Sequence, residues 1–133
     1  MMSEKAAVKC LLIVEDDDGI RASIVRWAAL IGVRTVSYPS VEACIQGLRH
    51  AEFSLCNEAH SINVTHAIVD ITLPGRNGFE LLSELSPPLA EERIIFMTAR
   101  LHEFPVQSGD PQNGPNILRK PFELSELERC IGL

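Results

Sequence analysis

Charged and hydroxyl side chains stand where several apolar runs of this sequence end. Glu15 and Asp16 follow the run VKCLLIV, and Asp70 closes the run AIVD. Thr98 closes the run RIIFMT, and Lys120 follows the short apolar pair IL. Runs of this kind are typical of buried strands, so each of these five side chains is expected at a strand end. Carboxylates, a hydroxyl and an amine are groups that bind divalent cations and phosphate.

The apolar runs alternate with segments of helical periodicity, which predicts the α/β fold class. We expect five strands, over residues 8–14, 33–38, 67–70, 93–98 and 117–118. We expect four helices, over residues 20–31, 41–49, 79–86 and 124–131. Such alternation predicts a doubly wound, five-stranded parallel sheet in which the carboxyl ends of all strands lie at one edge. The five side chains should therefore converge although they are far apart in the sequence.

The expected cluster would be suited to phosphoryl transfer. Three crowded carboxylates repel one another and raise the pKa of at least one, unless a cation neutralises them. Oxygen ligands with retained water suit Mg²⁺, which would screen Asp70 so that an anionic phosphoryl donor can approach. Asp70 would then attack as the nucleophile and form an acyl phosphate. Lys120 would offer a positive charge and Thr98 a hydroxyl donor to the phosphate oxygens.

Composition sets the general class of protein. The 133 residues suffice for a single domain, with a core expected over residues 8–132 and no output domain. The net charge of −6 disfavours direct binding to nucleic acid or to an anionic membrane, and no apolar stretch reaches the length of a membrane span. The four cysteines are far apart and form no CxxC pair, so we expect free thiols and a cytoplasmic location.

Other polar residues are expected to have structural roles. Asp17 or Asp18 can cap the helix that follows the acidic block, and Ser40 can cap the next helix. Segment 51–66 is expected to contain a helix end and a long polar loop. Three histidines lie in or beside it at irregular spacing, so we expect surface side chains rather than metal ligands: His50, His60 and His66.

Four motifs in order, VEDD, VDITLPGRNG, MTA and KPF, resemble those of the receiver domain of bacterial two-component response regulators. The resemblance extends over residues 10–131 and implies a flavodoxin-like sheet with strand order 2-1-3-4-5. It implies that Asp70 accepts a phosphoryl group from a histidine kinase or a histidine phosphotransfer protein. The signal would pass to a downstream target protein that the sequence does not identify, and the chain would be a signalling receiver rather than a metabolic enzyme.

The resemblance also assigns residues to roles around Asp70. Asp16, Asp70 and the backbone carbonyl of Thr72 would bind Mg²⁺, and Glu15 would assist through water. The side chains of Thr98 and Lys120 would sense the phosphoryl group. Thr72 and Arg100 match variable positions that tune dephosphorylation, which is expected to be slow.

The sequence departs from the receiver pattern in two places that bear on signal readout. The position three residues before Lys120 is usually aromatic in the family, and here it is Ile117. Prolines and glycines over residues 100–116 predict an irregular loop in place of the family's fourth helix. The loop before the third strand is also longer than usual.

These departures leave alternatives open. One is a pseudo-receiver, a protein-interaction module that signals without phosphorylation. Another is a flavodoxin-like cofactor binder or a phosphatase. The latter is disfavoured because no glycine-rich phosphate loop follows the first strand, where four consecutive acids would repel a cofactor phosphate.

Overall fold

The computed structural model describes residues 10–71, 77–98, 116–120 and 122–131. Five parallel strands form one sheet in the order β2-β1-β5-β6-β7, which confirms the predicted fold class and strand order. The strands are β1 (Cys10–Val14), β2 (Arg34–Tyr38), β5 (His66–Asp70), β6 (Ile94–Thr98) and β7 (Asn116–Arg119). The helical elements are α1 (Asp18–Leu30), α2 (Val41–Arg49), η1 (Gly78–Leu81), α3 (Leu82–Leu85), η2 (Glu91–Arg93) and α4 (Leu124–Ile131).

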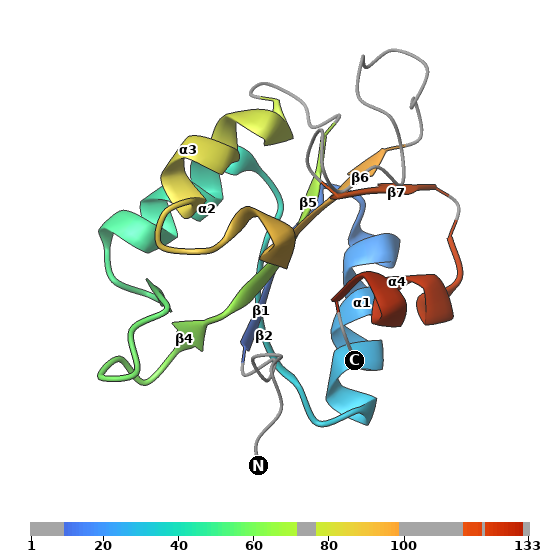
Figure 1. Cartoon of the computed structure of the whole chain (residues 1–133), viewed down its shortest axis with the longest axis horizontal. Helices are drawn as coiled ribbons and strands as arrows, with labels where there is room; N and C mark the ends of the chain where they lie inside the picture. Colours follow the sequence, from blue (N-terminus) through green and yellow to red (C-terminus); the bar gives the residue numbers. More distant parts are fainter. Residues whose placement is uncertain (1–9, 72–76, 99–115, 121, 132–133) are drawn as a thin grey trace.

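Helices cover both faces of the sheet. Figure 1 shows α1 and α4 side by side on one face, with α2 and α3 on the other. Successive side chains of a strand point to opposite faces, so Leu12 and Val14 of β1 join one apolar cluster while Leu11 and Ile13 join the second. The central strands β1, β5 and β6 are therefore apolar at nearly every position, because both of their faces are buried.

The strand register brings the carboxyl ends of the strands together. Val14 pairs with Val69 between β1 and β5, and Asp70 pairs with Met97 between β5 and β6. Thr98 pairs with Arg119 between β6 and β7. The residues that follow or close these strands therefore share one edge of the sheet.

The two predicted helix caps are confirmed. The backbone N–H of Ile20 donates to Asp17 Oδ1 at 2.9 Å, so Asp17 caps α1. The backbone N–H of Ala43 donates to Ser40 Oγ at 3.1 Å at the start of α2. The helix predicted over 79–86 is observed as two consecutive pieces, the 3₁₀ turn η1 and the short α-helix α3, and Asn77 and Glu80 form a capping box at its start.

The polar segment 51–66 contains strands that the sequence analysis missed. β3 (Ser54–Leu55) and β4 (Asn63–Val64) pair in parallel, and the backbone N–H of Ser54 donates to Ile62 O at 2.9 Å. Two-residue strands are too short to show a period-two pattern, and polar residues surround both of them. The interpretation of this segment as a helix end and a long polar loop was therefore wrong for the residues of β3 and β4.

His66 is a second correction. It was expected at the surface, but as the first residue of the central strand β5 it is only 4% exposed. Burial, together with the charge of Arg93, lowers the pKa of His66 to about 4. Its Nδ1 lies 2.8 Å from the hydroxyl of Thr65. The imidazole is therefore neutral in the folded protein near neutral pH.

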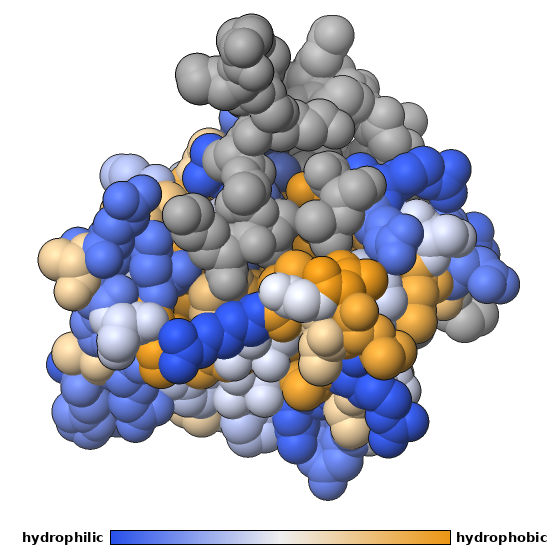
Figure 2. All heavy atoms as spheres, turned by 90° about the horizontal axis from the view of Figure 1, so that it is seen from below, coloured by the Kyte–Doolittle hydropathy of each residue, from blue (hydrophilic) through white to orange (hydrophobic). Residues whose placement is uncertain are grey.

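The surface described is mostly polar, with an apolar patch on the face shown in Figure 2. Among the described residues, the large apolar side chains that are exposed are Leu30, Ile31 and Leu124. Leu30 and Ile31 lie where α1 ends, just before Gly32, whose φ of +80° suits a helix stop. In the part of the chain that is described, no helix has the length and apolar character needed to cross a membrane.

The buried His66 should make stability depend on pH. The unfolded chain binds a proton on this imidazole below about pH 6.5, whereas the folded protein does not until about pH 4. The stabilisation is thus present above pH 6.5 and lost as the pH falls toward 4, by up to about 3 kcal/mol. Urea unfolding of wild type and His66→Asn at pH 7 and pH 4.5 should show a smaller loss in the variant. His50→Asn, at the exposed end of α2, is the matched control, and equal losses in all three proteins would contradict the assignment.

Candidate functional site

Glu15 is an acid held inside the protein at the end of β1. Its backbone N–H donates to Tyr38 O at 3.1 Å, which continues the pairing of β1 with β2. The backbone N–H of Asp17 donates to Glu15 Oε2 at 3.1 Å, and Arg21 Nη1 donates to the Glu15 carbonyl at 2.7 Å. These contacts direct the carboxylate inward, so that Glu15 has no exposed surface.

Lys120 connects the two buried carboxylates. Its Nζ donates to Glu15 Oε1 at 2.7 Å and to Asp70 Oδ2 at 3.1 Å. The backbone N–H of Lys120 donates to Thr98 O at 2.8 Å, which fixes the lysine to the end of β6. The side chain of Lys120 is 15% exposed, so the two ion pairs form in surroundings with little water.

Three carboxylates lie close enough to share one ion. Glu15, Asp16 and Asp70 each offer an oxygen, and these oxygens lie within 4.8 Å of one another. Asp16 is exposed, whereas the other two are buried. An all-oxygen donor set with one face open to water fits Mg²⁺, which keeps several water ligands. The residues present therefore fit the metal that the sequence predicted.

Burial dominates the electrostatics of this cluster. It raises the pKa of the Glu15 carboxyl to about 7; the hydrogen bond from Lys120 opposes the shift, and the nearby Asp70 adds to it. Burial alone would lower the pKa of Lys120, but the hydrogen bond to Glu15 and the charge of Asp70 outweigh it and raise that pKa. Lys120 therefore stays protonated at neutral pH, whereas the Glu15 carboxyl is close to its own pKa. A second cation would relieve the remaining repulsion between the carboxylates.

Asp70 lies at the carboxyl end of β5, as predicted, but it is nearly inaccessible. It is 2% exposed, and its Oδ2 faces the ammonium of Lys120. The chain turns back tightly against it, since the backbone N–H of Gly78 donates to Ile71 O at 3.0 Å. The expectation that Asp70 stands open to a phosphoryl donor is not met in this conformation.

The remaining predicted site residues have different outcomes. Thr98 is fully buried at the end of β6, on the edge of the sheet that carries Asp70 and Lys120. Ile117, at the position that is usually aromatic in the family, is 7% exposed and packs in the apolar cluster that includes the buried side chains of α2.

Thr72 and Arg100 lie outside the described residues. The segment 100–116, for which an irregular loop was predicted, also lies outside the described residues except for Asn116.

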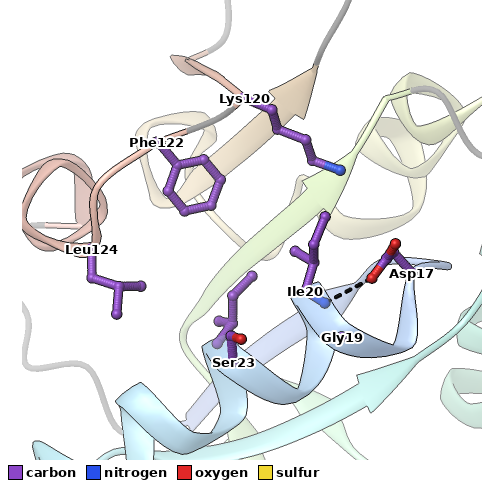
Figure 3. Close-up of a pocket in the computed structure, with 8 residues that line it drawn as sticks. Asp17, Gly19, Ile20, Ser23, Lys120, Phe122 and Leu124 are labelled. Carbon is purple, nitrogen blue, oxygen red and sulfur yellow. Dashed lines mark hydrogen bonds between the residues drawn. The ribbon is translucent and has the colours of Figure 1, made fainter.

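A groove beside the cluster was not predicted. It lies between α1 and the start of α4, has a volume of about 660 Å³ and is shown in Figure 3; we call it the α1–α4 groove. The residues that line it are Asp17, Gly19, Ile20, Ser23, Ile24, Lys120, Phe122 and Leu124. Three of its members were singled out in the sequence, Asp17 as a helix cap and Lys120 and Phe122 in the KPF motif. The sequence indicated only that its apolar helix residues would pack in the core.

Two further contributors to the site were missed. Arg21, on the first turns of α1, donates to the carbonyl of Glu15 and so supports the end of β1. Gly78 approaches Asp70 so closely that a Cβ on it would lie 2.0 Å from the Asp70 backbone oxygen. The NG dipeptide in the turn was the available signal for Gly78. No local pattern distinguishes Arg21 from any other surface arginine.

Comparison with known proteins assigns the family. The family model for the response regulator receiver domain matches residues 11–131, so the chain belongs to the receiver domains of response regulators. These are modules of two-component signalling that receive phosphate from histidine kinases.

The chain is 26% identical over 126 residues to the transcriptional regulatory protein RprY of Bacteroides fragilis, covering 95% of this chain and 48% of RprY. It is 29% identical over 123 residues to the transcriptional regulatory protein DltR of Streptococcus agalactiae, covering 92% and 50% of the two chains. The chain thus spans about half the length of these curated relatives.

Solved structures share the fold. The response regulator protein TrrA from Thermotoga maritima, solved in complex with Mg²⁺-BeF, is similar with a TM-score of 0.66 and 22% identity, over 93% of this chain and 96% of TrrA. A response regulator receiver domain protein from Clostridium thermocellum has a TM-score of 0.66 and 18% identity, over 94% and 92%. The likeness confirms the receiver fold.

The close approach of Gly78 to Asp70 makes this glycine sensitive to substitution. Gly78→Ala should lower the free energy of unfolding by about 1–3 kcal/mol, because the added methyl group collides with backbone rather than with a side chain that can move. Urea unfolding followed by circular dichroism measures this. Gly19→Ala is the control, because its Cβ would meet only Asp17 Oδ1 at 3.2 Å, and its effect should stay within about 1 kcal/mol. Equal stability of the two variants would contradict the argument.

Proposed function

We propose that this chain is a phosphoryl-accepting receiver in which Asp70 is the phosphoacceptor. The observation that carries the proposal is that Glu15, Asp16, Asp70 and Lys120 converge at one edge of a receiver sheet. The phosphoryl donor is a histidine kinase or a histidine phosphotransfer protein. A downstream target protein reads the phosphorylated state, without direct contact of this chain with nucleic acid or membrane.

The proposed metal ligands are the carboxylates of Glu15, Asp16 and Asp70, with Glu15 acting through water. The backbone carbonyl of Thr72, outside the described residues, completes the proposed set. When bound, Mg²⁺ neutralises the carboxylates and reduces their repulsion of an incoming phosphoryl group. The metal complex of TrrA supports this assignment, since TrrA shares the fold.

The phosphoryl transfer uses three side chains of this chain, those of Asp70, Lys120 and Thr98. A carboxylate oxygen of Asp70 attacks phosphorus, the bond between phosphorus and the donor's imidazole nitrogen breaks, and that nitrogen keeps the electron pair. Lys120 leaves Glu15 and pairs with a phosphoryl oxygen, for which its mobile point charge is suited. The Thr98 hydroxyl donates to another phosphoryl oxygen. Thr72 and Arg100 tune a slow hydrolysis of the acyl phosphate.

The remaining proposals concern organisation. Residues 1–133 comprise a single receiver domain, with no output domain inside this range. The protein acts in the cytoplasm. Readout of phosphorylation is atypical, because Ile117 lacks the aromatic ring that is usual at its position.

A pseudo-receiver that signals by contacts alone is the second candidate. The observations that favour it are Ile117 and the low accessibility of Asp70, which is 2% exposed. The complete set of carboxylates and lysine argues against it, since a module that binds only through its surface needs none of these buried charges.

Phosphorylation can be tested with a small donor. Incubation with acetyl phosphate and Mg²⁺ should add the mass of one phosphoryl group to the intact protein, as measured by mass spectrometry. Asp70→Asn should abolish the gain, whereas Asp18→Asn, which changes an exposed acid of the same sequence block, should keep it. No mass gain in wild type, or a gain that survives Asp70→Asn, would favour the pseudo-receiver.

The role of Lys120 gives a separate prediction. Lys120→Ala leaves Glu15 and Asp70 without their shared counter-charge and should lower the free energy of unfolding by about 3 kcal/mol without metal. Mg²⁺ supplies positive charge to the same oxygens, so it should raise the melting temperature of Lys120→Ala more than that of wild type. Thermal unfolding with and without Mg²⁺ measures both effects. A variant that Mg²⁺ no longer stabilises would show that Lys120 helps to hold the metal.

A further inference from the structure

A second cavity lies at the end of the sheet away from the carboxylate cluster. Its volume is about 360 Å³, and the residues that line it are Cys10, Arg34, Glu58, Ser61 and Asn63. Cys10 and Arg34 are the first residues of β1 and β2, so they lie at the amino ends of parallel strands. The other three belong to the segment between α2 and β5, and Figure 1 shows β4 of this segment beside the end where β1 begins. We call this cavity the Arg34–Glu58 pocket.

Two opposite charges line this pocket without neutralising each other. Arg34 Nη1 donates to Ser61 O at 3.1 Å, and the guanidinium has further N–H donors beyond this one. Both Arg34 and Glu58 are exposed, and within the described part of the chain neither forms an ion pair with a residue of opposite charge. The pocket therefore presents a cation and an anion to a ligand at the same time.

We propose that the Arg34–Glu58 pocket binds a small zwitterion, a free α-amino acid. The carboxylate of the ligand pairs with the guanidinium of Arg34, whose planar fork matches two carboxylate oxygens. The ammonium of the ligand pairs with the carboxylate of Glu58. Glu58 repels a purely anionic ligand and Arg34 repels a purely cationic one, so a ligand that carries both charges is favoured.

The rest of the lining fits a small polar ligand. The volume of about 360 Å³ lies near the lower end of the range of small-molecule pockets, about 300–1,000 Å³. The Ser61 hydroxyl and the Asn63 amide are polar groups that can bind a ligand side chain. Cys10 is 2% exposed, and burial raises the pKa of its thiol, although the charge of Arg34 opposes the shift. The thiol is therefore a neutral part of the pocket wall.

The backbone that carries Glu58 is held by an asparagine turn. The backbone N–H of Ala59 donates to Asn57 Oδ1 at 3.0 Å, which closes a turn around Glu58. The backbone N–H of Asn57 in turn donates to Asn63 Oδ1 at 2.7 Å. These two hydrogen bonds fix the backbone at Glu58 relative to Asn63 on the other side of the same segment.

The backbone around Ser61 is held by an imidazole ring. The backbone N–H of Ile62 donates to His60 Nδ1 at 3.0 Å, and His60 Nε2 lies 2.8 Å from Ala51 O. An imidazole that accepts at Nδ1 carries its proton on Nε2, which can then donate to that carbonyl. The segment is thus in place before a ligand arrives, and a preformed pocket lowers the entropic cost of binding.

Amide NMR of the full chain, recorded without Mg²⁺, tests the binding. The common L-amino acids are added one at a time, and at least one should shift the amides of Ser61 and Asn63 along a saturable curve. The amide of Asp16, at the opposite end of the sheet, should not shift. Acetate and methylammonium each carry one of the two charges and should bind at least about tenfold more weakly. No saturable shift with any amino acid, or equal binding of acetate, would overturn the proposal and leave the proposed function intact.

Variants that remove one charge test the two pairings separately. Arg34→Gln and Glu58→Gln should each raise the dissociation constant at least about tenfold. Arg49→Gln and Glu42→Gln change exposed charges on α2 and are the matched controls, which should bind as wild type does. The melting temperature of each variant shows whether the fold is kept, and Glu58→Gln, in an exposed turn, decides the matter if Arg34→Gln is unstable. Wild-type affinity in Glu58→Gln would overturn the proposal.

Discussion

The ion pairs of Lys120 with Glu15 and Asp70 are the interaction on which the site depends. Two carboxylates at a buried sheet edge repel each other and lose their hydration, which costs free energy unless a positive charge lies between them. Lys120 supplies that charge from the position directly after β7, the last strand of the sheet. Its backbone hydrogen bond to Thr98 makes the position of the ammonium a property of the sheet register. Site and fold are thus specified by the same contacts.

This arrangement explains how two buried carboxylates can lie near each other in a stable fold. The ammonium of Lys120 supplies the positive charge between them, at 2.7 Å from Glu15 Oε1 and 3.1 Å from Asp70 Oδ2. The side chain of Lys120 therefore joins the carboxylates to the α1–α4 groove, which it also lines.

Much of the fold could be predicted because the sheet is buried on both faces. Runs such as CLLIV and IIFMT are apolar throughout, and residues Asp17 and Ser40 mark the helix starts by side-chain chemistry that acts locally. The convergence of Glu15, Asp70 and Lys120 followed from parallel topology alone. These are features in which a short stretch of sequence and the tertiary structure favour the same outcome.

Other features depend on contacts that no short stretch contains. His66 is a polar residue that the central strand buries, and β3 and β4 exist through pairing across the seven residues that separate them. The steric limit at Gly78 comes from the backbone of Asp70, which the sequence places in another element. The contact of Asp70 with an ammonium group arises in the same way, since that group belongs to a residue 50 positions later.

The sequence separation of the central ion pair has a consequence for how the chain folds. Glu15 and Lys120 are 105 residues apart, and the Trp27–Glu128 hydrogen bond spans 101. Contacts this distant in sequence form late, after the loop-closure entropy of nearly the whole chain has been lost. During synthesis from the amino terminus, the acids of β1 and β5 are made before the lysine that neutralises them. A nascent chain that stops short of β7 therefore holds these carboxylates without the ammonium that neutralises them, and the cluster is complete only when the last strand of the sheet has been made.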